Sequence, residues 1–322
     1  TDSSPGANDN ASGMAGTIEA ARVLSRYRFN GTIVYAGLSG EEQGLYGGRT
    51  VARVAQEEGW SIIGVLNNDM IGNVSGVNGV VDNGSARVFS DGTPPTETEQ
   101  QRRLRRFTGG EVDGVSRQLA RYVDRIADQY VRNLDVMMIY RLDRFGRGGH
   151  HRPFADLGYP AVRIMETNEN YTRQHQDIRV EDGIAYGDVL AGVDFDYAAK
   201  LTALNAATLA SLAWAPAPPR DVVICGAVRP RASMRWQPPA DMSNVSGFRV
   251  YWRETASPTW DHSYPIGLEA LFTADDRDGV EQIYARYDFT GLVIDNYFFG
   301  VAAVSEDGAE STVAFPRPGR GC

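Results

Sequence analysis

The pattern of apolar residues changes at a proline-rich segment, residues 215–219 (APAPP), and this change limits the possible folds more than any other feature. Before it, apolar runs with helical spacing alternate with short β-rich runs, whereas after it only short runs rich in aromatic and β-branched residues follow. Such a segment is stiff and typical of a domain boundary. The sequence therefore predicts an α/β domain at residues 1–214, a linker at 215–219 and an all-β domain at 220–322.

Strands and helices are expected to alternate in the first part. Apolar spacing predicts helices at residues 12–27, 49–58, 115–131, 153–157 and 195–212, and strands at 32–38, 62–70, 136–140 and 161–165. Ser12 is a candidate cap for the first helix. Residues 82–110 are rich in Gly, Pro, Thr and charge, so they are interpreted as an insertion or surface loop. The alternation favours a mostly parallel sheet flanked by helices.

The second part is expected to be a β-sandwich. Strands are predicted at residues 232–237, 247–254, 297–304 and 310–315, and about 100 residues with such strands suit that architecture. Trp236, Tyr251 and the spacing from Leu292 to Tyr297 resemble a fibronectin type III domain over about residues 220–317. The resemblance implies that Trp236 and Tyr251 are core residues, that Tyr297 is a tyrosine corner, and that the domain serves packing or adhesion.

Composition excludes some classes of function. The net charge of −9 and the pI near 5.1 argue against a nucleic-acid binder, which needs a basic surface. No apolar run approaches the roughly 20 residues of a membrane helix.

The chain starts at Thr1, so its beginning is expected to have been cut or lost, and we expect a secreted or periplasmic protein. We expect Cys225 and Cys322 to be free thiols, and the alternative is a disulfide between them, which would suit an exported protein.

Acidic residues and one histidine follow the predicted strands. Asp9 lies in a Gly/Asn-rich loop before the first helix, Glu41 and Glu42 follow strand 32–38, Asp69 closes strand 62–70, and His175 follows strand 161–165. Alone, each has an ordinary interpretation as a helix cap, a turn residue or a surface group. Ligands gather beyond the carboxyl ends of strands in open α/β sheets. Carboxylate and imidazole together suit zinc, so the set predicts a metal site.

These residues stand in segments that resemble the M28 family of zinc metallopeptidases. The segments are residues 4–13 (SPGANDNASG), 39–47 (SGEEQGLYG), 67–72 (NNDMIG), 154–166 (FADLGYPAVRIME) and 168–177 (NENYTRQHQD). Their order and spacing also match, and the resemblance covers about residues 2–212.

The resemblance implies a role for each residue of the set. Asp9 bridges two zinc ions, Asp69 and His175 complete one zinc site with it, Glu42 binds the second zinc, and Glu41 is the general base. The family's second zinc also takes a histidine from a His-x-Asp motif before the bridging aspartate. No histidine precedes Asp9, so we expect that motif in an upstream segment.

Histidines outside this set are assigned lesser roles. His150 and His151 are interpreted as structural or surface residues, with a place near the substrate as the alternative, and His262 is expected to be uninvolved.

The resemblance predicts hydrolysis of peptide or protein substrates, most simply by an aminopeptidase. A carboxypeptidase on the same fold would need a cationic pocket for the terminal carboxylate. The alternatives are a glutaminyl cyclase-like acyltransferase that uses one zinc, and an inactive, peptidase-like binding protein. Side-chain preference and oligomeric state are left open by the sequence.

Overall fold

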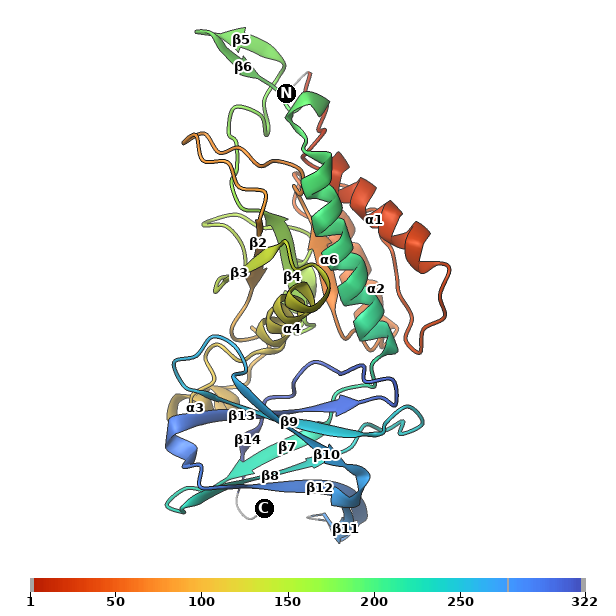
Figure 1. Ribbon diagram of the computed structural model, residues 1–322, viewed down its shortest axis with the longest axis vertical. Coiled ribbons are helices and arrows are strands. Elements are labelled where there is room, and N and C mark those ends of the chain that lie inside the picture. Colours follow the sequence, from red (N-terminus) through yellow and green to blue (C-terminus); the bar gives the residue numbers. More distant parts are fainter. Residues whose placement is uncertain (1–2, 277, 320–322) are drawn as a thin grey trace. The chain divides into compact units, whose positions relative to one another are not determined.

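The computed structural model describes residues 3–276 and 278–319, which form two compact units (Figure 1). The first unit comprises Thr1–Arg28, Ile33–Thr96 and Val115–Ala210, and the second comprises Phe29–Thr32, Glu97–Gly114 and Ser211–Cys322. This division differs from a single boundary at residues 215–219. Two segments from the first part of the sequence belong to the second unit by their contacts.

The sheet of the first unit has four strands in the order β1-β4-β2-β3. The strands are β1 (Val65–Asn68), β2 (Ser85–Ser90), β3 (Asp135–Ile139) and β4 (Ala161–Glu166). β1 pairs with β4 and β2 with β3 in parallel, whereas β2 and β4 are antiparallel. Three predicted strands are thus present, with bounds that differ from the predicted ones by at most three residues. The sheet is mixed, with two of its three pairings parallel.

The interpretation of residues 82–110 as a surface loop is wrong. This stretch contains β2, which pairs with two neighbours in the sheet, and α3 (Glu99–Thr108), which belongs to the second unit. Ala86, Val88 and Phe89 of β2 are buried. Arg87 interrupts their apolar run, and its guanidinium pairs with Glu169 at 2.9 Å. The charge of Arg87 favoured a surface loop in the sequence interpretation, because its partner Glu169 lies 82 residues away and cannot be recognised locally.

The strand expected at residues 32–38 is also absent from the structure. These residues are outside every strand, and Val34 is 59% exposed. A strand needs a neighbour that exchanges ladder hydrogen bonds with it. Among the described residues, no segment forms such a ladder with residues 32–38.

The helices predicted for the first part are present. They are α1 (Ala11–Leu24), α2 (Tyr46–Glu57), α4 (Val115–Tyr130), α5 (Arg152–Asp156) and α6 (Phe195–Trp214). The cap of α1 is Asn10 rather than Ser12, because the Asn10 side chain accepts a hydrogen bond from the Gly13 N–H at 3.2 Å. Within residues 3–276 and 278–319, none of the helices has both the length and the apolar character that a bilayer crossing requires.

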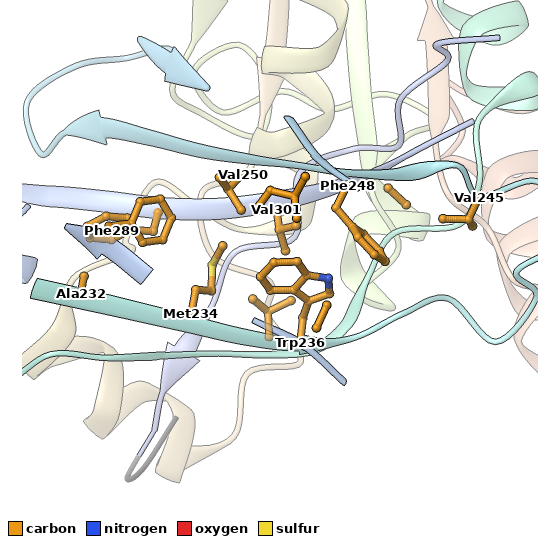
Figure 2. Close-up of a cluster of buried hydrophobic side chains, with 13 residues drawn as sticks. Ala232, Met234, Trp236, Val245, Phe248, Val250, Phe289 and Val301 are labelled. Atoms are coloured by element: carbon orange, nitrogen blue, oxygen red, sulfur yellow. The ribbon is translucent and has the colours of Figure 1, made fainter. Parts of the chain in front are cut away.

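The second unit contains two sheets around one core. One sheet has the order β11-β12-β8-β7-β14 and the other β10-β9-β13. The strands are β7 (Arg220–Cys225), β8 (Arg231–Gln237), β9 (Gly247–Glu254), β10 (His262–Gly267), β11 (Leu271–Asp275), β12 (Glu281–Thr290), β13 (Tyr297–Val304) and β14 (Arg317–Pro318). Side chains from both sheets meet in a buried cluster that includes Trp236, Phe248, Val250 and Val301 (Figure 2).

Three of the four strands predicted for the second part are present, and Trp236 and Tyr251 are buried as expected. The fourth, at residues 310–315, is wrong, because only two isolated bridges occur there. The Ser311 hydroxyl accepts the Ala303 N–H at 3.0 Å and takes the place of a ladder bond. Cys225 is disulfide-bonded rather than free, and Cys322 lies outside the described residues.

A buried ion pair explains why residues 97–114 belong to the second unit. Asp113 and Arg253 of β9 are joined by two contacts of 2.9 and 2.8 Å, and both side chains are almost fully buried. Such bidentate pairs are strong and directional. Gly109 adopts φ +79°, and a Cβ there would lie 2.8 Å from the Phe298 ring, so this segment approaches the sheet closely.

Candidate metal centre

Three potential metal ligands lie together in the first unit. His175 Nε2 is 2.9 Å from Asp9 Oδ2 and 2.7 Å from Glu42 Oε1. One ligand atom from each residue lies within 4.8 Å of the others. The carboxylate of Asp9 is mostly buried, whereas the side chains of Glu42 and His175 are about half exposed. The cluster is therefore open to solvent on one side.

Each ligand comes from a loop beside a helix or strand. Asp9 precedes α1, and Glu42 lies in a turn in which the N–H groups of Gly44 and Leu45 both donate to Glu41 O, at 3.0 and 2.9 Å. This turn leads into α2. His175 follows β4 and has a positive φ of 56°, which is uncommon for a residue other than glycine. The three loops thus converge, although of these residues only His175 follows a strand, because the strand expected before Glu42 is absent.

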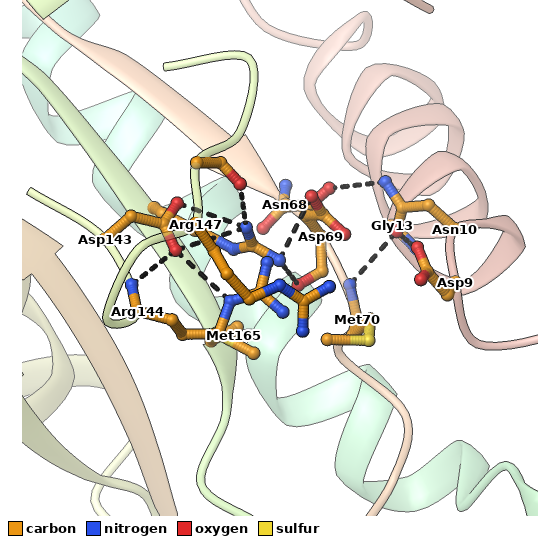
Figure 3. A network of polar contacts seen from close by, with 12 residues as sticks. Asp9, Asn10, Gly13, Asn68, Asp69, Met70, Asp143, Arg144, Arg147 and Met165 are labelled. Atoms are coloured by element: carbon orange, nitrogen blue, oxygen red, sulfur yellow. Dashed lines mark hydrogen bonds and ion pairs between the residues drawn. The ribbon is translucent and has the colours of Figure 1, made fainter. Parts of the chain in front are cut away.

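Asp69 follows β1 and is held by a buried arginine. Its Oδ2 lies 3.1 Å from Nη2 of Arg163, a β4 residue that is fully buried. The other end of the same guanidinium contacts Asp143 at 3.1 Å and the Gly148 carbonyl at 2.8 Å. Asp69 and Asp143 thus belong to one polar network, which Figure 3 shows.

This arrangement differs from the expected pairing of ligands. His175 contacts Glu42 and Asp9, whereas the sequence interpretation paired His175 with Asp69. Sequence reasoning also missed Arg163 and Asp143. An arginine inside the apolar strand AVRIME is a signal that could have found them, because a buried charge requires a partner.

Burial and neighbouring carboxylates raise the pKa of two carboxyl groups at this centre, Asp9 and Glu41. Burial, and then Asp69, raise the pKa of Asp9 to about 6, although His175 and Arg163 oppose the shift. Burial, Asp69 and Glu42 raise the pKa of Glu41 to about 7. Negative charge is therefore in excess at this place, and a bound cation would relieve the repulsion. Two carboxylate oxygens and one imidazole nitrogen, with an open side, are a donor set that fits catalytic zinc.

The other histidines make different contacts. His151 is fully buried, its Nε2 lies 2.8 Å from Leu142 O, and burial lowers its pKa to about 4. His150 Nδ1 accepts the Gly48 N–H at 3.2 Å. Both are buried in the first unit, and neither belongs to the three-residue group.

Comparison with known proteins identifies the family. The model of peptidase family M28 matches residues 1–182. A probable zinc metalloprotease of Pyrenophora tritici-repentis is 39% identical over 318 residues, which are 98% of this chain and 62% of that protein. A probable zinc metalloprotease of Leptosphaeria maculans is 38% identical over 99% of this chain and 70% of that protein.

The chain spans about 62% of the length of the Pyrenophora tritici-repentis protein. Among solved structures, the fn3 domain of human collagen alpha-1(XX) chain covers 34% of this chain with 13% identity and a TM-score of 0.22, which is too low to assign a fold. The family model matches more than half of the chain, and the two relatives are named as zinc metalloproteases, in agreement with it. The chain therefore belongs to peptidase family M28.

Proposed function

We propose that this protein hydrolyses peptide bonds with zinc as its cofactor, and that it acts as an aminopeptidase. The observation that carries the proposal is the three-residue group of Asp9, Glu42 and His175, whose ligand atoms lie within 4.8 Å of one another. The names of the relatives, probable zinc metalloproteases, support the choice of metal.

In this proposal Asp9, Glu42 and His175 would hold one zinc ion, and Asp9 and Asp69 would hold a second. The Arg163 contact fixes the orientation of the Asp69 carboxylate. Zinc supplies Lewis acidity, which polarises a carbonyl group and makes water more acidic.

Glu41 is the residue proposed to move the proton. It precedes the ligand Glu42, is half-buried, and lies outside the three-residue group. From there its carboxylate takes a proton from the attacking water and returns it to the leaving amine, as a general base and then a general acid. The carboxylates around the site also favour a substrate whose cationic N-terminal amine lies near them, which supports an aminopeptidase over a carboxypeptidase.

The test separates metal binding from catalysis. Zinc binding is measured by isothermal titration calorimetry, and hydrolysis by release of p-nitroaniline from a panel of aminoacyl p-nitroanilides, with and without chelator. Glu41→Gln is expected to keep zinc and lose activity by about 10²–10⁴-fold, because general-base catalysis contributes that much. His175→Ala is expected to lose zinc. Absence of zinc binding by the unaltered protein would sink the proposal, and binding without aminoacyl release would reject the aminopeptidase assignment.

We also propose that the second unit is a fibronectin type III-like module that serves packing or adhesion rather than chemistry. Two sheets that share a core around Trp236 support this assignment. The exported location stays a prediction.

A further inference from the structure

The backbone of the Asp9 loop is held by one buried carboxylate. Asp188 Oδ1 accepts the Asn8 N–H at 2.9 Å, and Oδ2 accepts the Asp9 N–H at 2.7 Å. The carbonyl of Asp188 also accepts the Ala7 N–H at 3.2 Å. Asp188 is 2% exposed, so water does not compete for these bonds. Three consecutive N–H groups, the last of them that of Asp9, are thus bound by a single residue.

Asn8 fixes the same loop from its side chain. Its Nδ2 donates to Glu166 Oε2 at 2.8 Å, and its Oδ1 accepts the Gly72 N–H at 2.8 Å and the Ser12 hydroxyl at 3.0 Å. These partners come from the end of β4, the loop after β1 and the start of α1. The loop before Asp9 is therefore tied to the elements that surround the metal centre.

The segment that follows His175 is bound to the same loop at two places. Beyond His175, the Ile178 N–H donates to Ser3 O at 3.0 Å, and the Ser3 N–H donates to the Asp177 carboxylate at 2.7 Å. Asp188 ends this segment, 13 residues after His175 in the sequence. The chain that follows His175 is thus connected to the Asp9 loop at two places, near residues 177–178 and at Asp188.

We propose that Asp188 is a positioning residue that holds Asp9 at the distance from His175 that metal binding requires. Asp188 does not contact the metal in this proposal, and acts through the backbone of Asp9. The inference rests on the proposed zinc site. A carboxylate suits the role because it offers two acceptor oxygens, one for each N–H. An asparagine of the same shape offers one oxygen and turns its NH₂ toward the other donor, so one buried N–H loses its partner.

The experiment compares zinc affinity in Asp188→Asn and in a matched control. Asp82→Asn is the control, because Asp82 also accepts two backbone N–H groups, from Gly84 at 2.8 Å and Ser85 at 3.0 Å, but in another loop and both on Oδ1. Partners that orient metal ligands typically affect affinity by 10–100-fold, so Asp188→Asn should weaken zinc binding by about that factor while Asp82→Asn binds as the unaltered protein does. Cobalt absorption spectra provide a second readout, because a displaced ligand changes the bands.

Each outcome decides something. Unaltered zinc affinity and cobalt spectrum in a folded Asp188→Asn protein overturn the inference and leave the proposed function intact. Equal losses in Asp188→Asn and Asp82→Asn also overturn it, because they indicate a general loss of stability. Failure of the unaltered protein to bind zinc rejects the proposed function itself. If Asp188→Asn does not fold, Asp188→Glu takes its place, because it keeps both oxygens but displaces them by one methylene group. A weaker zinc affinity is expected, and an unchanged one counts against the inference.

Discussion

Replacement of Arg163 by methionine tests the buried network that holds Asp69. Arg163 is fully buried, and its guanidinium lies 3.1 Å from a carboxylate oxygen of Asp69 and 3.1 Å from one of Asp143. At an effective dielectric constant of about 20, each contact corresponds to about 5 kcal/mol of gross Coulomb attraction. The desolvation of the arginine offsets much of this gain.

The net loss of stability depends on the buried charges that remain after the substitution. Methionine fills much of the volume of arginine, but two buried carboxylates are then without their cation. Removal of one partner from a buried pair costs about 3–5 kcal/mol, and we expect Arg163→Met to lower the free energy of unfolding of the first unit by that amount.

Hydrogen exchange measured by mass spectrometry on peptides of β4 checks the value, because it reports on the first unit alone. A loss of 3–5 kcal/mol lowers protection by about two to four powers of ten. Arg53→Met is the control, since the Arg53–Glu57 pair on α2 is more than half exposed and should contribute less than about 1 kcal/mol. The double variant Arg163→Met/Asp143→Asn should recover part of the loss. Protection in Arg163→Met within tenfold of the control would refute the reasoning.

Two further predictions concern pH and the core of the second unit. Burial, Asp128 and Asp135 raise the pKa of Asp124 to about 6, so the folded protein binds more protons than the unfolded chain between about pH 4 and 6, and stability falls as pH rises through that window. Asp124→Asn should therefore stabilise the protein by about 1–2 kcal/mol at pH 7.5, after solvent screening, which raises Tm by a few degrees. Near pH 4 the substitution should leave Tm unchanged. A thermal shift assay that shows equal gains in Tm at both pH values would contradict this prediction. Trp236→Ala removes a fully buried side chain and should destabilise the second unit by about 3–5 kcal/mol, seen as faster hydrogen exchange in β9; unchanged exchange there would show that the core does not depend on it.

Local features of the sequence determined much of the first unit. Helical spacing predicted α1, α2, α4, α5 and α6, and their bounds differ from the expected ones by a few residues. The sequence placed Asp9, Glu42 and His175 in loops next to predicted elements, and the three meet in the structure. The rule that ligands gather at strand ends accounts for His175, which follows β4, but not for Glu42, because the strand expected at residues 32–38 is absent. Periodicity and turn residues act over a few positions, so one sequence shows them.

Tertiary structure decided which segments pair and which atoms meet. β2 was hidden by Arg87, whose partner Glu169 is far away in the sequence, whereas the apolar residues 32–38 gained no ladder partner among the described residues. The sequence paired His175 with Asp69, but the folded loops bring it to Glu42, and Arg163 takes Asp69 instead.

Asp188 gave no local signal at all, because its bonds to the Asp9 loop cross 179 positions of the chain. Spacing along a sequence shows which residues could be ligands. Which of them share an ion depends on angstrom-scale distances between loops, and those distances are set by hydrogen bonds and ion pairs between segments far apart in the chain.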